Sequence, residues 1–222
     1  MRKPSAIALF AILCSLNLCV MVVPSYATTV TVGGTSVLNS GQVSPVVGAT
    51  TVDFDFLQNG APQSFTSGIA NYSNVLIFSN DPPDIANDST HFASVQAGND
   101  LTISFSQPIS YFGFYWGSPD PANTITLFNG AQTVFSYTGL ALHNDLGVPF
   151  GLGSGAFVNF TASSDEAYTS VVISAAGSFP FENDNNAFVA QTAAVPEPSG
   201  FMLLSSGLAG LAGMMIRRKR NR

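Results

Sequence analysis

The sequence predicts an all-β fold: an antiparallel, jelly-roll-like sandwich of two sheets, between an N-terminal signal peptide and a C-terminal membrane-spanning helix. Three observations support this. The body of the chain contains many short runs rich in Val, Thr, Ile and Phe, separated by turn residues. Some runs alternate apolar and polar residues, and no helical period of useful length interrupts them. Such spacing favours two packed antiparallel sheets over a helical or mixed fold.

The N-terminal segment, residues 1–27, has the layout of a secretory signal peptide. Arg2 and Lys3 precede an apolar run over residues 6–23, and Pro24 ends it. Small residues then place the expected cut between Ala27 and Thr28. Export by the Sec translocon and removal by signal peptidase follow. The alternative is an uncleaved N-terminal anchor, which the proline and the small residues disfavour.

Both cysteines of the chain, Cys14 and Cys19, lie within this segment. The mature protein would therefore contain no thiol and no disulfide, which excludes a cystine-stapled scaffold, a Cys-ligated zinc site and a cysteine enzyme. The body that follows is long enough to form one domain around its own core. We expect the β-sandwich to occupy residues 28–192.

Within this body, the apolar runs and turns predict the individual strands. They cover residues 50–57, 74–79, 100–106, 110–116, 123–129, 133–137, 156–161, 168–175 and 186–191. In the first, Asp53-Phe54-Asp55-Phe56 alternates strictly, so Phe54 and Phe56 are expected to face the core. Asn129-Gly130 and the segment 118–121 mark two of the turns.

Charge is distributed unevenly along the chain. All seven Lys and Arg residues lie at the two ends, whereas every acidic residue except Glu197 lies in the body. No Lys or Arg salt bridge can form within such a domain. Nucleic-acid binding is excluded, because no side chain could neutralise phosphates. The carboxylates are expected to be solvated or to bind cations.

The C-terminal segment combines three features in order. A linker over residues 193–200 contains Pro196, Glu197 and Pro198; an uncharged, Gly-rich stretch follows over 201–216; and a basic cytoplasmic tail closes the chain at 217–222. The apolar helix would span about 24 Å, slightly less than a hydrocarbon core of about 30 Å. The basic tail would hold the body outside the cytoplasm.

This arrangement resembles the PEP-CTERM sorting signal of exported proteins in Gram-negative bacteria. The resemblance implies transient residence in the inner membrane, recognition by exosortase and cleavage near Pro196-Glu197-Pro198. The product would reach the cell surface or an extracellular matrix of biofilm exopolysaccharide. The alternative is a permanent single-span anchor behind a Pro-rich linker.

The segment 110–123 (SYFGFYWGSPDPAN) resembles a strand and turn common in PEP-CTERM surface proteins with lectin-like, carbohydrate-binding sandwiches. Trp116, Tyr115 or Tyr111 could stack on the apolar face of a sugar, and Asp120 and Asn123 could form hydrogen bonds with its hydroxyls. The alternative for Trp116 is burial in the core, the usual place for a large aromatic residue on a strand.

Calcium is the expected cofactor if a cation is bound, because it takes carboxylate, amide and carbonyl oxygens. Glu182, Asp184 and Asn185 are the candidate metal ligands on composition, and the stretch 181–185 that contains them resembles the acidic closing strand of lectin-like domains. Composition alone also leaves open the loop acids Asp81, Asp84 and Asp88 and the pair Asp53 and Asp55, or a solvated acidic loop.

Catalysis has little support in the sequence. His91 and His143 stand alone, and no nucleophile elbow, zinc-protease motif or phosphate loop is present. We therefore expect an exported, exosortase-processed surface or matrix protein with carbohydrate binding as its candidate activity, and not an enzyme. A secreted glycan hydrolase and a permanently anchored envelope protein are the alternatives.

Overall fold

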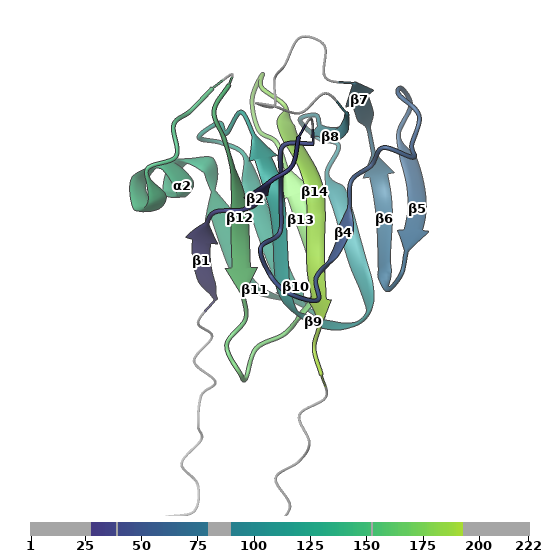
Figure 1. The fold of residues 1–222 in the computed structure, drawn as a ribbon, viewed down its shortest axis with the longest axis vertical. Helices are drawn as coiled ribbons and strands as arrows, with labels where there is room; N and C mark the ends of the chain where they lie inside the picture. Colours follow the sequence, from purple (N-terminus) through teal and green to yellow (C-terminus); the bar gives the residue numbers. More distant parts are fainter. Residues whose placement is uncertain (1–27, 39, 80–89, 152, 193–222) are drawn as a thin grey trace, which may run out of the picture. The chain divides into compact units, whose positions relative to one another are not determined.

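The computed structural model describes residues 28–38, 40–79, 90–151 and 153–192. The described strands pair antiparallel throughout, which confirms the all-β, antiparallel prediction (Figure 1). The elements are β1 (Thr29–Val32), β2 (Thr35–Ser36), β3 (Gln42–Val43), β4 (Thr50–Val52), β5 (Gln63–Ser67), β6 (Ala70–Val75), β7 (Ile77–Ser79), β8 (His91–Val95), β9 (Leu101–Gly117), β10 (Thr124–Asn129), β11 (Gln132–Thr138), α2 (Gly139–Leu146), β12 (Gly155–Thr161), β13 (Tyr168–Ser174) and β14 (Phe181–Ala190).

The long strand β9 belongs to both layers of the fold. Its first half, through Phe105, pairs with β6 and β13, and its second half, from Tyr111, pairs with β12 and β14. Ile109, between the halves, pairs with both Tyr168 of β13 and Ala190 of β14. Between the halves, residues 106–108 are exposed. Pro108 has no N–H to give to a neighbouring strand, so its place at this change of partners is favourable. The sequence predicted two strands here, 100–106 and 110–116, where the structure has one.

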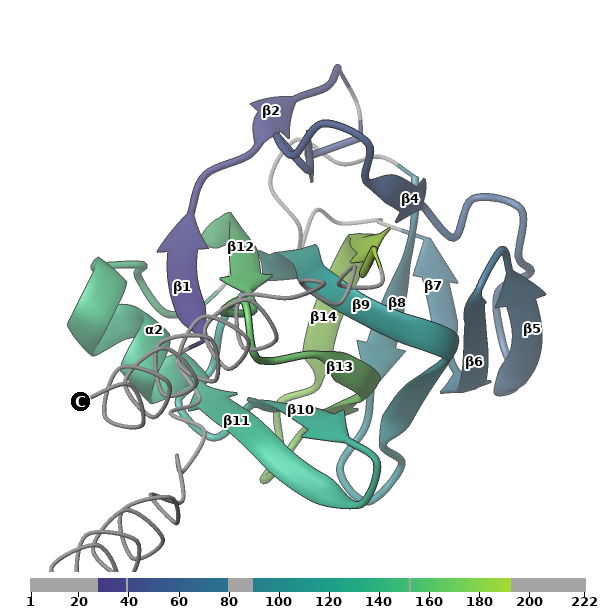
Figure 2. The ribbon, with the colours of Figure 1, turned by 90° about the horizontal axis from the view of Figure 1, so that it is seen from below.

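Each half of β9 organises one layer. The first layer runs β5-β6-β9-β13-β10-β11. The second runs β1-β12-β9-β14-β8-β7, with β4 beside the far half of β14. Figure 2 shows β10 and β11 on one side of the domain and β1 and β12 on the other. The hydrogen-bonded sheet is therefore continuous, but it forms a β-sandwich-like pair of layers.

Aromatic side chains join the two layers across the core. Phe105 of the first layer meets Phe188 of the second with ring centroids 5.3 Å apart, and Tyr137 meets Phe160 at 6.0 Å. Offset and edge contacts of this kind add to the stabilisation from burying the rings. The predicted run 100–106 forms the start of β9, with Ile103 and Phe105 buried and the serines between and after them exposed, as an alternating strand requires.

The predicted strand 50–57 is largely wrong. β4 ends at Val52, and Phe54 adopts a left-handed backbone with φ of 61°. The Leu57 N–H then donates to the Phe54 carbonyl at 2.9 Å, closing a turn. Phe54 is buried as expected, but the turn breaks the alternation and leaves Phe56 61% exposed. Burial of the Phe54 ring offsets a left-handed backbone that costs a non-glycine residue about 1–2 kcal/mol.

The helix α2 was not predicted, because it has only two turns and no long apolar period. Its caps explain why it forms. The Thr138 side chain accepts a hydrogen bond from the Ala141 N–H at 3.1 Å, and Gly147 ends the helix with a left-handed φ of 71°. Both are standard terminal signals for a helix. Within the described residues, no helix is long and apolar enough to cross a membrane.

The remaining predicted strands agree with the structure to different degrees. Runs 123–129, 133–137, 156–161 and 168–175 match β10 to β13 closely, and run 74–79 covers the end of β6 and all of β7. Run 186–191 misses the polar first half of β14. The sequence did not predict β1, β5, β8 or the two-stranded β2–β3 sheet.

The segment 33–49 covers part of the outer face of the second layer. Its Ser44 hydroxyl lies 2.8 Å from the Tyr111 hydroxyl, and its Ser40 carbonyl accepts from Asn185 Nδ2 at 2.8 Å. A Cβ added at Gly34 would lie 2.7 Å from Phe157 Cβ, so the glycine allows the segment to approach closely. Residues of the second layer can therefore be buried on both faces.

The described elements pair only with one another and close one main core. Residues 28–192 are therefore expected to fold as an independent unit, since a core of this extent is typical of a self-sufficient domain. The predicted signal peptide (1–27), the Pro-Glu-Pro motif in the 193–200 linker, the 201–216 helix and the 217–222 tail lie outside the described residues.

Candidate functional site

Trp116, predicted as a sugar-stacking residue, lies in the core. It has no exposed surface, and its ring stacks on Phe181 with centroids 4.4 Å apart. Phe114 packs against it at 5.5 Å. A sugar would have no access to either face of the indole, so the alternative interpretation of Trp116 as a core residue agrees with the structure.

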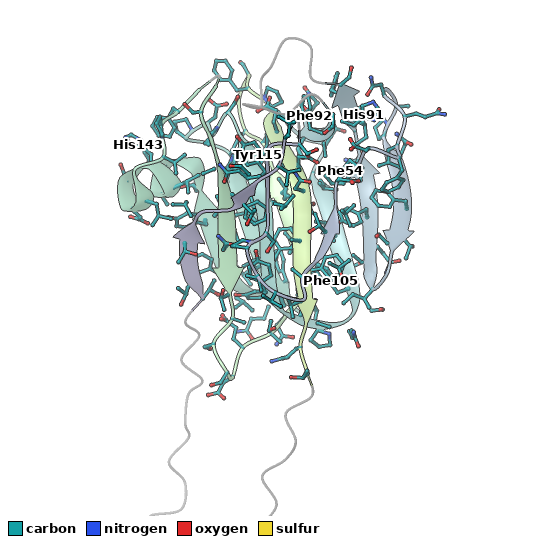
Figure 3. The ribbon with its side chains drawn as sticks, in the orientation of Figure 1. Phe54, His91, Phe92, Phe105, Tyr115 and His143 are labelled. Carbon is teal, nitrogen blue, oxygen red and sulfur yellow. The ribbon has the colours of Figure 1, made fainter. Side chains whose placement is uncertain are left out.

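Tyr115 points to the opposite face of β9, away from the main core. It is only 2% exposed and belongs to a second apolar cluster with Phe92 and Phe157. Figure 3 shows Tyr115 and Phe92 toward the same end of the domain. A Cβ added at Gly155 would lie 2.6 Å from the Tyr115 hydroxyl, so the phenol ring extends toward this bare glycine. Tyr115 is thus too well covered for the stacking that the sequence predicted.

Asn123 is fully buried, and its hydrogen bonds connect the turn after β9 to neighbouring segments. Its Nδ2 donates to the Pro180 carbonyl at 3.2 Å, and its backbone carbonyl accepts from the Gly139 N–H at 2.9 Å. Its own N–H donates to the Asp120 carbonyl at 3.1 Å, which closes the turn after β9. Asn123 therefore fixes the turn that carries Asp120 to two neighbouring segments.

Asp120 is the predicted glycan-binding residue that does reach the surface. It is half-buried, and burial raises the pKa of its carboxyl above the ordinary value. The structure thus separates the four predicted residues: Tyr115 and Trp116 face opposite sides of β9, Asn123 is a buried support, and Asp120 is available to a ligand.

Three loops converge around Asp120, and we call them the Asp120 loops: β9–β10, α2–β12 and β13–β14. The Ser118 N–H donates to the Ser154 carbonyl at 2.8 Å, and the Gly151 N–H donates to the Pro119 carbonyl at 3.2 Å. The bond from Asn123 to Pro180 joins the third loop. Backbone hydrogen bonds thus hold together segments from three parts of the chain.

Two exposed aromatic rings flank this cluster, and sequence reasoning missed both. Phe150 is 37% exposed and precedes Gly151; Phe179 is 66% exposed and precedes Pro180. His143 of α2 stacks on Phe150 at 4.4 Å. The signal that could have found them is a single aromatic residue beside Gly or Pro in a predicted turn. Exposed rings beside a carboxylate can supply both an apolar surface and a hydrogen-bond acceptor.

The predicted metal ligands lie on β14. Glu182 and Asp184 share the outer face of the second layer, opposite Gly117 and Tyr115 of β9. Both are buried, with exposed fractions of 6% and 0%. Asn185 has a left-handed φ of 51°, sits where the register shifts, and donates to the Ser40 carbonyl. Its side-chain nitrogen is therefore used to hold the covering segment 33–49.

The described part of the chain contains no group of three or more His, Cys, Asp or Glu side chains placed to hold a metal ion. Asp53 and Asp55 accept hydrogen bonds from backbone groups instead. Asp53 Oδ1 accepts from the nearby Asp55 N–H, and Asp55 Oδ1 accepts from the N–H of His91, at the start of β8, at 3.0 Å. The other candidates, Asp81, Asp84 and Asp88, lie outside the described residues. Calcium binding stays a prediction.

Comparison of the chain with protein-family models, curated proteins and solved structures found no match. The candidate site therefore stands on its geometry: one half-buried carboxylate, two exposed rings and a hydrogen-bonded loop framework.

Proposed function

We propose that this is an exported, exosortase-processed protein of the cell surface or extracellular matrix, with a jelly-roll-like sandwich that binds polysaccharide. The distribution of charge carries the proposal. Every Lys and Arg lies before residue 4 or after residue 216, in segments suited to a membrane machine. Removal of both segments would leave a wholly acidic domain without thiols.

The Asp120 loops are the proposed binding site. A sugar offers apolar C–H faces and a rim of hydroxyls, which match the Phe150 and Phe179 rings and the Asp120 carboxylate. The loop framework supports the site, because preformed loops lose less conformational entropy on binding. The absence of Lys and Arg from the body favours an uncharged polysaccharide over an acidic one.

The position of these loops suits a surface protein. β9 and β14 run antiparallel, with Gly117 opposite Glu182 at one end and Ile109 opposite Ala190 at the other. The β9–β10 loop follows Gly117, and the other two Asp120 loops precede β12 and β14, whose first residues lie beside Gly117. All three loops therefore lie at the end of the layer far from Ala190, the last residue of β14. The proposed binding site and the chain end that precedes the predicted processing site therefore lie at opposite ends of this layer.

The test is a pull-down of residues 28–192 with uncharged polysaccharides, repeated with EDTA. We expect Phe179→Ala to weaken binding by roughly two- to tenfold, because an aromatic contact contributes about 0.5–1.5 kcal/mol. Phe150→Ala and Asp120→Asn should also weaken it. Phe56→Ala is the matched control, since Phe56 is similarly exposed but lies in a different loop.

Binding that survives all three loop substitutions would refute this site. Turnover of the polysaccharide without stable binding would instead favour the secreted hydrolase. Loss of binding in EDTA would support the calcium prediction, whereas unchanged binding would show that polysaccharide binding does not require calcium.

A further inference from the structure

Glu166 is a buried carboxylate at the end of the domain where both described chain ends lie. It occupies the loop between β12 and β13 and is 1% exposed. Its Oε2 accepts from the Thr28 hydroxyl at 3.0 Å and from the Ser163 N–H at 3.2 Å. Its backbone carbonyl accepts from Gln191 Nε2 at 3.1 Å. One residue thus contacts the first described residue and the segment just after β14.

Tyr168 completes this arrangement, which we call the end clasp: Thr28, Glu166, Tyr168 and Gln191. The Tyr168 hydroxyl lies 3.0 Å from Thr28 Oγ1. Figure 1 shows the start of β1 and the end of β14 at the same end of the domain, in agreement with these contacts.

The second carboxylate oxygen of Glu166 could accept a further hydrogen bond. Oε1 is buried and accepts no hydrogen bond from any part of the chain that the structure describes. A buried carboxylate is costly unless a cation or several donors compensate its charge. The sequence offers no Lys or Arg between Lys3 and Arg217. His143 is engaged elsewhere, with its Nδ1 3.0 Å from the Val148 carbonyl oxygen.

The predicted signal-peptide cleavage would create one cation at this place. A cut between Ala27 and Thr28 converts the uncharged Thr28 amide into an α-ammonium with three donor hydrogens. In threonine, the backbone nitrogen and Oγ1 lie about 3 Å apart. Because Thr28 Oγ1 already contacts Glu166, the new ammonium would lie within reach of the carboxylate.

We propose that the α-ammonium of mature Thr28 binds the Glu166 carboxylate, so that removal of the signal peptide completes the end clasp. The inference rests on the cleavage site in the proposed function. In the precursor, the Thr28 nitrogen is uncharged and has one hydrogen. Processing would therefore stabilise the domain by supplying its single fixed positive charge, as charge-assisted hydrogen bonds are stronger than neutral ones.

Two other titratable groups lie near this pair. Asp165 precedes Glu166 in the loop but is exposed. Burial raises the pKa of Tyr168, the hydrogen bond with Thr28 lowers it, and the Glu166 charge raises it further. Tyr168 thus remains neutral throughout the range in which an α-amino group titrates, at about 7.7–8.0 in an unfolded chain.

The test compares residues 28–192 before and after removal of an N-terminal tag whose cleavage leaves Thr28 first. At pH 6.5 we expect cleavage to raise Tm by roughly 3–6 °C. Pairing raises the α-amino pKa in the folded state, so the gain is complete below about pH 7.5 and disappears as pH rises through the folded value.

An acetylated sample and substitutions in the Glu166 loop test whether the gain in Tm comes from the ammonium–carboxylate pair. Acetylation of the cut protein should abolish the gain, and because the segment contains no Lys, its only amine is the α-amine. Glu166→Gln should also abolish it, whereas Asp165→Asn, in the same loop, should preserve it. Equal Tm before and after cutting, or a gain that survives acetylation, would overturn the proposal.

Sequencing the N-terminus of the native protein tests the cleavage itself. A first residue other than Thr28 would refute the predicted cut and the role of the pair in the native protein. Because the tagged sample is cut by design, its Tm reports pairing independently of that result.

Discussion

At the scale of single residues, buried polar groups connect segments that are distant in sequence. The Tyr111 hydroxyl donates to Asn159 Oδ1 at 2.7 Å and also contacts Ser44 Oγ. Asn159 in turn donates to the Gly33 carbonyl at 3.0 Å. These bonds join β9, β12 and the covering segment 33–49. Such networks specify one arrangement when each member is satisfied.

Removing the Tyr111 hydroxyl tests this network. Tyr111→Phe would leave Asn159 Oδ1 without its donor, and we expect the free energy of unfolding in urea to fall by about 1–3 kcal/mol. Ser44→Ala is the control with a smaller effect, because Tyr111 could still donate to Asn159. An unchanged midpoint for Tyr111→Phe would show that the network contributes nothing to stability.

Buried tyrosines also predict how stability changes in alkali. Burial raises the pKa of Tyr111 to about 12, although the hydrogen bond with Ser44 partly lowers it. Burial raises the pKa of Tyr72 even more. Burial first, and then Asp145, raise the pKa of Tyr137 to about 12. In the unfolded chain tyrosines ionise near pH 10, so above that pH the unfolded state binds fewer protons.

Stability should therefore be retained up to about pH 10 and lost as pH rises toward 12. Tyrosinate absorbance measured alongside circular dichroism checks this expectation. We expect the buried tyrosines to ionise together with unfolding. Independent ionisation of all tyrosines near pH 10 in a folded protein would contradict the burial described.

Sequence reasoning predicted part of this residue-scale picture. The core alternative for Trp116 and the inward face of Phe54 followed from aromatic residues on strands. The burial of Tyr115 and Asn123 did not, because the groups that cover them come from remote segments. Asp120 was identified, but Phe150 and Phe179 are isolated rings in loops, where no periodic pattern marks them.

At the scale of elements, some strands are marked by their local sequence, whereas others depend on tertiary contacts that the local sequence does not show. The apolar runs in the sequence predicted β10, β12 and β13 with nearly their full lengths. The polar start of β14, FENDN, gave no strand signal because its burial depends on partners far away, including Ser94 of β8 and Ser40. The continuity of β9 was likewise hidden, because its exposed residues 106–108 suggested a gap between two strands.

The cap of α2 provides a test at this scale. Thr138→Ala removes the acceptor for the Ala141 N–H and should lower the free energy of unfolding by about 1 kcal/mol. Thr138→Ser keeps the hydroxyl and should retain most of the stability. If the alanine and serine variants melt at the same temperature, the cap does not stabilise this short helix.

At the scale of the whole molecule, one account connects the charge pattern with the fold. The body is an all-β domain whose described ends meet at Glu166, while the Asp120 loops lie at the other end of the second layer. The Lys and Arg side chains of the full chain are confined to the two terminal segments, outside this domain. Processing at both ends would leave self-repelling acidic surface, which favours solubility outside the cell.

The central claim is that both terminal segments are removed, and the intact mass of the native protein tests it most directly. Peptides should come from a protease that cuts at acidic residues, because the body contains no tryptic site. We predict a mature protein that starts at Thr28 and ends near Pro198. Native protein at the cell surface that retains residues 201–222 would contradict it and establish a permanent anchor instead.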